Sequence, residues 1–403
     1  MIDSLSDTII LVADDQPDVV RTLCQPLHKA GASLRYVSDA YAALAALATH
    51  PTDLILADMK MPPEEWGGLW LLRELRKGGW AVPVMALSGE GSKRQVIEAQ
   101  RLGANGWVDK DLASEELLQQ CATLLTDSFE QALDLASLRL PTPLACRFAR
   151  YARMTDPDKR MNEGLHALEV VLRFAALLGL SSTPPQPLQA ITIEKIRAPS
   201  MRTWLELCTA LARAPGAGTD FIRLLSFLIP NRAHHKLIND FISIRNNVAH
   251  GRAMLDPIEG RLLDALLRRF AHRAQSAWRA DIAVPISMTY DGSNYHVEVL
   301  KLSGTGTPNP TVVNCPVPVI TGGLVLLSPN AGPLPLAPWL ITQRTDDPTK
   351  LPCLLFDGLR YVKGEPSADT PFKYSGADSA SELGSAPIQP GGTWQALAPW
   401  TTR

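Results

Sequence analysis

Residues 54–63 read LILADMKMPP, a hydrophobic run that ends in one carboxylate and a Met-Pro turn. Such a short apolar run is typical of a strand buried on both faces, which here would deliver Asp58 at its carboxyl end. Similar apolar runs occur along the first third of the chain, at 8–13, 34–37, 82–87 and 106–108. Helical patterns lie between them, at 17–30, 39–48, 67–77, 92–102 and 113–125. This alternation predicts a doubly wound α/β fold with a five-stranded parallel sheet.

Polar residues follow these predicted strands at the points where the strands end. Asp14 and Asp15 follow the first strand, Asp58 the third and Ser88 the fourth, and Lys110 comes after the fifth. Three carboxylates at one edge repel one another unless a cation neutralises them, and a set of oxygen ligands suits Mg²⁺. A carboxylate beside Mg²⁺ and a lysine can attack a phosphoryl donor, because both cations stabilise the charge on the transferred oxygens.

The order and spacing of these residues resemble the receiver domain of two-component response regulators. The resemblance implies that Asp58 is the phosphate acceptor, that Ser88 and Lys110 are catalytic side chains and that Trp107 is the switch aromatic. It also implies that the metal ligands are Asp14, Asp15 and Asp58. One departure is Asp111 directly after Lys110, where the family usually has proline. Two other interpretations remain: the acids are helix caps, or the domain keeps the receiver fold without phosphorylation.

The composition indicates a soluble globular protein. The chain of 403 residues exceeds what one core usually supports, its hydrophobic content is 46% and its net charge is −2. No uninterrupted apolar run reaches about 18 residues, and the first residues, MIDSLSDTII, lack the pattern of a signal peptide. The six cysteines show no CxxC spacing, which suits a reducing compartment. We therefore expect a cytoplasmic protein with no membrane span.

Charge and proline content divide the chain into parts. Residues 1–128 carry a net charge of −7, residues 145–280 carry +9, and residues 281–403 contain 16 of the 32 prolines. These changes predict five segments: a receiver domain at 1–128, a linker at 129–144, an α-helical bundle at 145–280, a β-rich module at 281–363 and a largely flexible tail at 364–403.

The middle part reads as a helical bundle, with patterns at 157–180, 200–213, 219–229, 233–250 and 255–279. One stretch in it, ISIRNNVAHG at 242–251, is unusually polar on one side. On a helix, four residues form a polar stripe opposite an apolar one: Asn239, Ser243, Asn246 and His250. Gly251 then ends the predicted helix.

This stretch resembles the Arg-x4-His motif of HEPN domains, which are helical bundles found in RNases and nucleotide-binding proteins. By that resemblance Arg245 and His250 carry the chemistry, and Asn246 is the polar residue that follows the arginine. The resemblance implies a metal-independent endoribonuclease that acts on RNA as a homodimer. The same residues also fit a non-catalytic bundle interface, because a histidine at a helix C-terminus interacts favourably with the macrodipole.

The last part predicts short β-strands at 295–300 and 324–327, separated by Gly, Pro and Asn turns. Residues 364–392 are rich in Gly, Ser, Pro and Asp, which is typical of flexible segments. No catalytic constellation occurs in this part, so we expect a platform for a partner.

Two hypotheses of function follow. In the first, the chain is a response regulator phosphorylated on Asp58 by a sensor histidine kinase or phosphotransfer protein. Phosphorylation then controls a HEPN-like output, an RNase in stress or phage defence. In the second, the chain is a non-enzymatic phosphorelay or scaffold protein whose bundle dimerises and binds a protein partner. No basic helix with helix-turn-helix spacing follows the receiver-like part, which disfavours a promoter-binding regulator.

Overall fold

The computed structural model describes most of the chain and divides it into two compact units. The described residues are 5–89, 93–189, 191–249, 256–329, 331–343, 351–360, 366, 370–376 and 394–401. The first unit contains Met1–Leu133 and Arg268–Trp278, and the second contains Asp134–Leu267 and Arg279–Arg403. Each unit is described by itself.

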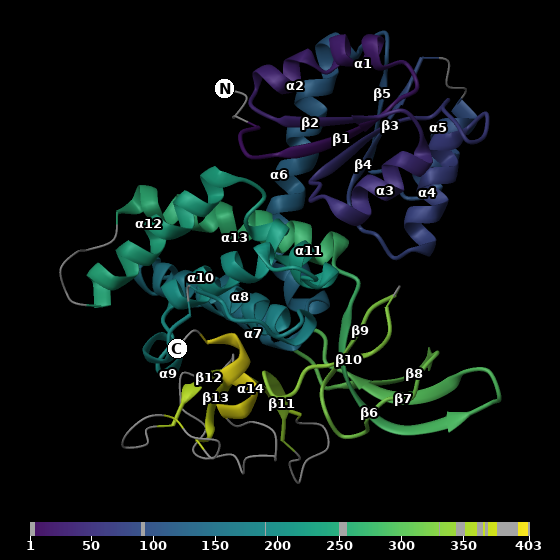
Figure 1. Cartoon of the computed structure of the whole chain (residues 1–403). Helices are drawn as coiled ribbons and strands as arrows, with labels where there is room; N and C mark the ends of the chain where they lie inside the picture. Colours follow the sequence, from purple (N-terminus) through teal and green to yellow (C-terminus); the bar gives the residue numbers. More distant parts are fainter. Residues whose placement is uncertain are drawn as a thin grey trace. The chain divides into compact units, whose positions relative to one another are not determined.

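The first unit is built on a parallel sheet in the order β2-β1-β3-β4-β5. Its strands are β1 Ile9–Ala13, β2 Ser33–Val37, β3 Leu54–Asp58, β4 Val84–Ser88 and β5 Gly106–Asp109. All five predicted strands are confirmed. The central strand β3 is buried along its whole length, because helices cover both faces of the sheet (Figure 1).

The helices of this unit are α1 Pro17–Leu23, α2 Gln25–Lys29, α3 Ala40–Thr49, α4 Gly67–Lys77, α5 Lys93–Arg101 and α6 Ala113–Arg139. Apolar side chains of α1, α2 and α6 share one core with those of the strands, including Ile10, Leu56 and Leu87. The single helix expected at 17–30 is divided into α1 and α2, because Pro26 has no N–H to continue the hydrogen-bond ladder.

The linker expected at 129–144 is instead helical. Helix α6 runs on to Arg139, and α7 begins at Thr142. No glycine or proline interrupts residues 113–139, and Leu125, Ala132 and Leu133 are buried at or beyond the expected end. Helix α6 therefore continues because its apolar side chains remain buried and no residue breaks the helix. The change in charge alone did not mark its end.

The second unit contains most of the remaining helices. They are α7 Thr142–Arg153, α8 Pro157–Ser182, α9 Ile193–Arg197, α10 Met201–Arg213, α11 Thr219–Leu228, α12 Arg232–Ala249 and the beginning of α13 Pro257–Ala277. Helix α8 starts at a favourable cap, where the Asp156 carboxylate accepts a hydrogen bond from the Lys159 N–H at 2.9 Å. It packs against α7, α10 and α11.

Helix α8 is also the one helix of the described residues with the length and composition of a membrane span. Its most apolar stretch has a mean hydropathy of 1.5, yet 83% of that stretch is buried inside the unit. A largely apolar helix that is buried in this way is the core helix of a bundle.

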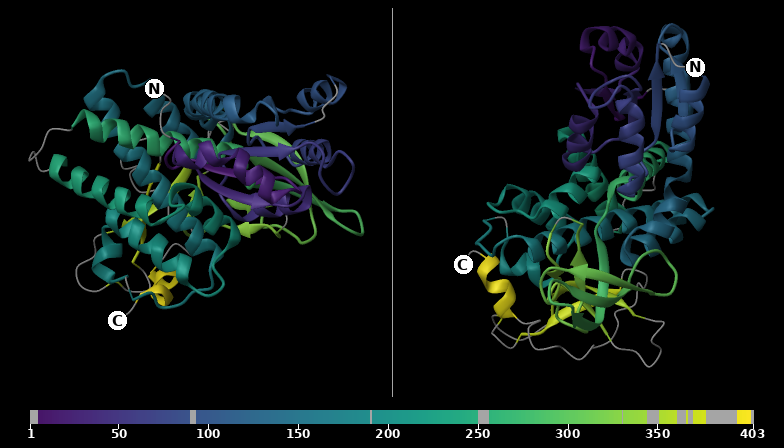
Figure 2. Two further views of the ribbon diagram at one scale, coloured as in Figure 1. Left: turned by 90° about the horizontal axis from the view of Figure 1, so that it is seen from above. Right: turned by 90° about the vertical axis from the view of Figure 1, so that its right-hand side faces the viewer.

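Two antiparallel sheets complete the second unit. One, in the order β10-β9-β6-β7-β8, consists of β6 Asp281–Tyr290, β7 Tyr295–Lys301, β8 Asn309–Cys315, β9 Val325–Leu327 and β10 Leu334–Pro335. The other, in the order β11-β12-β13, consists of β11 Leu340–Thr342, β12 Cys353–Leu359 and β13 Phe372–Gly376. The long strands β6 and β7 lie side by side (Figure 2). The β-rich part expected after the bundle is therefore present as two sheets.

The smaller sheet is joined to the helices by a buried arginine. Arg173 of α8 donates hydrogen bonds to the main-chain oxygens of Phe356 and Leu355 in β12. Its guanidinium also lies 5.9 Å from the ring centroid of Trp204. The sheet thus shares the core of the bundle.

The tail expected at 364–403 is partly folded. Strand β13 lies in it, as do α14 Trp394–Leu397 and the 3₁₀ turn Ala398–Trp400. Trp400 is 1% exposed, and Thr401 forms a bridge with Leu188. The expectation was wrong for these residues because composition averaged over a long segment hides a few aromatic side chains that reach a core.

Residues Arg268–Trp278, expected in the bundle, belong to the first unit. His272 is buried there, and its Nε2–H donates to the main-chain oxygen of Asp53 at 2.9 Å. Its Nδ1 has no hydrogen-bond partner among the described atoms. The ring packs edge-on against Phe129, at 5.1 Å between centroids. The imidazole is therefore neutral, because a proton on Nδ1 would be buried without an acceptor.

The burial of neutral His272 predicts that the first unit is less stable in acid. Burial lowers the pKa of His272, and nearby Arg273 adds to the decrease, although Asp53 opposes it. Since the unfolded chain takes up this proton first, the stability from neutral His272 is complete above about pH 6.5 and falls as the pH decreases from there through the folded pKa. We expect urea midpoints to drop between about pH 7.5 and 5.5, and His272→Gln to show a smaller drop. Equal drops would contradict this assignment.

Candidate functional site: an acidic edge of the parallel sheet

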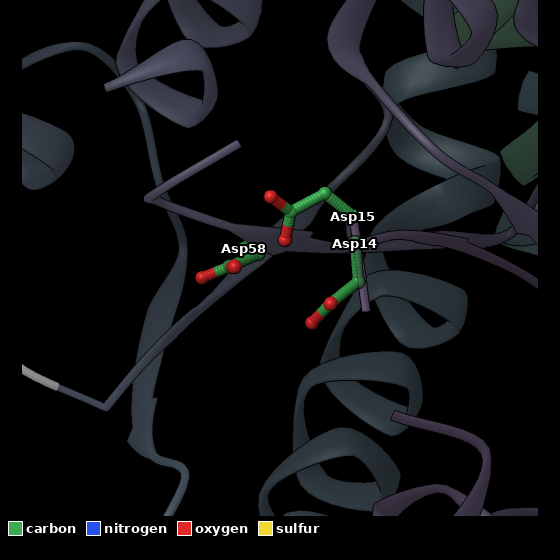
Figure 3. A group of neighbouring side chains, drawn as sticks. All are labelled: Asp14, Asp15 and Asp58. Atoms are coloured by element: carbon green, nitrogen blue, oxygen red, sulfur yellow. The ribbon is translucent and has the colours of Figure 1, made fainter. Parts of the chain in front are cut away.

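Three carboxylates meet where β1 and β3 end (Figure 3). Asp14 and Asp15 follow β1, and Asp58 is the last residue of β3. One oxygen of each side chain lies within 4.8 Å of an oxygen of the others. Asp14 and Asp58 are buried, and Asp15 is exposed. Neighbouring parallel strands bring their carboxyl ends to one edge, so the structure gathers the three acids that the sequence predicts.

Lys110 supplies the counter-charge to the two buried acids. Its Nζ lies 2.8 Å from Asp14 Oδ2 and 3.0 Å from Asp58 Oδ2. The main chain holds it there, because the Lys110 N–H donates to the Ser88 oxygen at 2.9 Å. One ammonium thus bridges two carboxylates that come from different strands.

The charges of this site are coupled. Burial raises the pKa of the Asp58 carboxyl, and Lys110 opposes that increase while Asp14 adds to it. Burial by itself would lower the pKa of Lys110, but its hydrogen bonds to Asp14 and Asp58 raise the pKa overall. Two buried carboxylates and one ammonium leave negative charge uncompensated, which favours a further cation.

The donor set fits Mg²⁺. Asp14, Asp15 and Asp58 offer only oxygen atoms, which hard divalent cations prefer over nitrogen or sulfur. Asp15 is exposed and so leaves one side of the cluster open to water, as Mg²⁺ requires because it keeps part of its hydration shell. These three residues can therefore hold such an ion.

The loop after Asp58 depends on two glycines. A Cβ at Gly68 would lie 2.5 Å from the Asp58 main-chain oxygen, and a Cβ at Gly67 would lie 2.0 Å from the Met61 oxygen. Both distances are far below van der Waals contact with main-chain atoms, which cannot move aside independently. The loop also donates its Lys60 N–H to Asp58 Oδ1 at 3.3 Å. The start of α4 can therefore press against the site only because these positions are glycine.

Ser88 and Trp107 lie on the neighbouring strands. Ser88 ends β4 and is 5% exposed, one residue beyond Leu87, the register partner of Asp58. Trp107 of β5 pairs with Ala86 and is half-buried. Its indole Nε1 is buried without a hydrogen-bond partner among the described atoms. Both residues therefore lie near the carboxyl edge from which Asp58 projects.

The second predicted set of residues is only partly described. Arg245 lies on α12, and its Nη2 lies 2.6 Å from Glu169 Oε2 on α8. Asn246 is exposed, and His250 falls outside the described residues. The structure thus brings Arg245 to a carboxylate that the motif did not include.

Sequence reasoning missed Glu169 and a nearby histidine, His166. Burial raises the pKa of Glu169, while Arg245 and Arg173 oppose the increase. Burial also lowers the pKa of His166, and Arg147 adds to the decrease. The signal was present, because polar residues on α8 interrupt an otherwise apolar helix at 163, 166, 169 and 173.

Comparisons with known proteins bear on the first unit. The family model for the response regulator receiver domain matches residues 10–122. The transcriptional regulatory protein KdpE of Mycobacterium tuberculosis is 33% identical over 112 residues, which are 28% of this chain and 48% of that protein. The nitrogen assimilation regulatory protein NtrX of Azorhizobium caulinodans is 31% identical over 27% of this chain and 24% of that protein. The chain spans about half the length, or less, of these relatives.

Solved structures also show similarity to part of the chain. A receiver domain of the Francisella response regulator 1452 is 27% identical, covers 30% of this chain and 98% of that chain, and has a TM-score of 0.28. A CheY-like receiver domain protein from Methanospirillum hungatei is 24% identical, covers 30% and 94%, and has a TM-score of 0.27.

Proposed function

Because residues 10–122 are a response regulator receiver domain, we propose that this chain is a response regulator whose phosphate acceptor is Asp58. One observation carries the assignment. Lys110 bridges Asp14 and Asp58 at 2.8 and 3.0 Å, with Asp15 in the same cluster. A nucleophilic carboxylate, a fixed ammonium and two further acids are the groups that phosphoryl transfer to an aspartate needs.

In this proposal each residue of the site has a separate role in phosphoryl transfer. An oxygen of Asp58 attacks the phosphorus atom, a P–O bond forms, and the bond between phosphorus and the donor atom breaks with its electron pair. Lys110 can then turn from the carboxylates towards the phosphoryl oxygens, and the Ser88 hydroxyl can donate to one of them. Asp14, Asp15 and Asp58 would hold Mg²⁺, which neutralises charge on the transferred group. Trp107, on the adjacent strand, is the aromatic side chain that would respond to the new position of Ser88.

The phosphoryl donor in this proposal is a histidine residue of a sensor kinase or phosphotransfer protein. Both carry out this exchange in the cytoplasm, which is where the proposal places the chain. A small phosphodonor such as acetyl phosphate tests the site without the partner. With Mg²⁺ we expect one phosphoryl group per chain by intact mass, which hydroxylamine removes because it is an acyl phosphate, and none when EDTA removes the metal. A chain that stays unmodified in Mg²⁺ would refute the proposal.

For the output we propose the HEPN-like endoribonuclease that the Arg-x4-His motif suggests. The observation in its favour is the Arg245–Glu169 pair of 2.6 Å, in which the Arg245 side chain remains 29% exposed and thus accessible to a phosphate. Residues 145–267, which leave out the arginines of the first unit, still carry a surplus of positive charge, and this favours an anionic partner.

RNA cleavage by the purified chain tests this output. We expect cleavage without added metal and its loss in His250→Ala, because an imidazole can accept and donate a proton in the reaction and the methyl group of alanine cannot. Arg245→Lys should restore only part of what Arg245→Ala loses, since a lysine cannot form a bidentate contact to phosphate. The matched control is Arg232→Ala, at an exposed position where α12 begins, which removes the same charge and should cleave like the wild type.

An intact chain that cleaves no RNA, with or without the phosphodonor, would instead support the scaffold hypothesis. In that case the bundle forms a homodimer and binds a protein partner. The output is then measured as the molar mass of the protein in solution before and after phosphorylation, which gives its oligomeric state.

A further inference from the structure

The last part of α13, which we term the α13 end segment (Arg268–Trp278), is an integral part of the receiver's unit. Along the chain, most of the helical bundle lies between this segment and the rest of that unit, Met1–Leu133. The family model of the receiver domain matches residues 10–122 and does not include this segment. The segment is therefore an addition to the receiver fold and requires a physical explanation.

A buried ion pair fixes this segment to the start of β3. Arg273 Nε lies 2.8 Å from Asp53 Oδ1, and Arg273 Nη2 lies 2.7 Å from Asp53 Oδ2. Arg273 is 1% exposed and Asp53 is fully buried. Such a bidentate pair has a defined geometry, and removing either partner would leave a buried charge without compensation. The segment is therefore attached firmly.

Asp53 also connects β3 to β1. Its Oδ2 accepts a hydrogen bond from the Ile9 N–H at 2.8 Å, and its own N–H donates to the Ile9 oxygen at 2.7 Å. Arg273 Nη2 donates in addition to the Asp7 oxygen at 2.9 Å. One guanidinium thus holds the starting ends of the two strands whose other ends carry the acidic cluster.

Further contacts extend the attachment to the neighbouring elements. The Ala81 N–H, just before β4, donates to the Ser276 oxygen at 2.9 Å. Arg269 donates to the Ser6 oxygen at 2.9 Å, and Arg268 donates to the Glu130 oxygen of α6 at 2.9 Å. The segment therefore contacts the bases of β1, β3 and β4, which are the strands that lead to the acidic cluster and to Ser88.

We propose that phosphorylation of Asp58 changes how firmly the α13 end segment is attached to the first unit. The two events are energetically coupled through β1 and β3. Both strands are short, buried and hydrogen-bonded to each other, so they transmit a change at one end as a shift of the whole strand. The beginning of α13 belongs to the second unit, so the same helix carries the change to the output. This inference rests on the proposed function of Asp58.

Hydrogen exchange of the full chain, with and without acetyl phosphate and Mg²⁺, tests the coupling. We expect the exchange rates of amides in the α13 end segment to change by about five-fold or more on phosphorylation. Asp58→Asn should abolish the change. Arg273→Lys should reduce it, because a lysine cannot bridge both oxygens of Asp53. The matched variant Arg261→Lys, at an exposed position earlier on α13, should leave it unaltered.

The intact mass of the same samples separates the possible failures. If Asp58 carries phosphate and the exchange of the segment is unchanged, the inference is wrong and the segment only stabilises the fold. If Asp58 takes up no phosphate, the proposed function is wrong, and the inference fails with it.

Discussion

Asp58→Asn should take up no phosphate from acetyl phosphate and Mg²⁺ under conditions that label the wild-type chain. The amide oxygen of asparagine carries no formal charge, so it is a far weaker nucleophile than the Asp58 carboxylate. The substitution also removes one of the three acidic ligands and one of the two carboxylates that Lys110 bridges. Intact mass measurement, with loss of the adduct on treatment with hydroxylamine, gives the result directly.

Asp18→Asn is the matched control for this experiment. Asp18 also lies in the first unit, but its side chain is 97% exposed and its pairing with Arg21 is long, at 3.8 Å. Such an exposed pair contributes little to stability, so this variant should be labelled like the wild type. Phosphate on Asp58→Asn, at a level similar to that of Asp18→Asn, would show that another residue is the acceptor.

Arg273→Met should produce the largest loss of stability in the first unit. The methionine fills much of the same volume but leaves the fully buried Asp53 carboxylate without its cation. Breaking a buried pair by removing one partner costs about 3–5 kcal/mol. Urea unfolding should therefore show a clearly lower midpoint for this variant, followed by fluorescence or circular dichroism.

The double variant Asp53→Asn/Arg273→Met tests the cause of that loss. Since it removes both charges, it should recover part of the stability that Arg273→Met loses. Arg261→Met, at an exposed position on the same helix, should change the free energy of unfolding by no more than about 0.5 kcal/mol. A loss for Arg273→Met as small as that for Arg261→Met would mean that the buried pair contributes nothing to the fold.

The sheet and its acidic edge could be predicted because their signals are local. The apolar run of β3 and the Asp58 that follows it are adjacent in sequence, and parallel strands necessarily bring such ends together. Asp14, Asp15 and Lys110 could be placed by the same argument. The bridging of Asp14 and Asp58 by Lys110 needed the structure, because side-chain distances depend on how the loop after β5 returns over the edge.

The extent of the helices was predicted less well. The end of α6 at Arg139 and the start of α7 fell in a segment that changes in charge, which had suggested a linker. The net charge of a segment depends mainly on the residues on the solvent-facing side of its helices. The end of a helix depends instead on glycine or proline residues that break it and on which of its positions are buried. The first breaker after α6 is Pro141, and the sequence alone contained that information.

The sequence by itself determined the order of strands and helices in residues 8–125, the acids at the strand ends and the helical pattern at 157–180. These features follow from periodicity and from the chemistry of neighbouring residues. Only the tertiary structure decided that Arg273 pairs with Asp53, 220 residues away, and Arg245 with Glu169, 76 residues away. Many arginines and acids in the chain could have formed such pairs. Burial selects among them, because a charge that leaves water must find an opposite charge at the place where packing brings it.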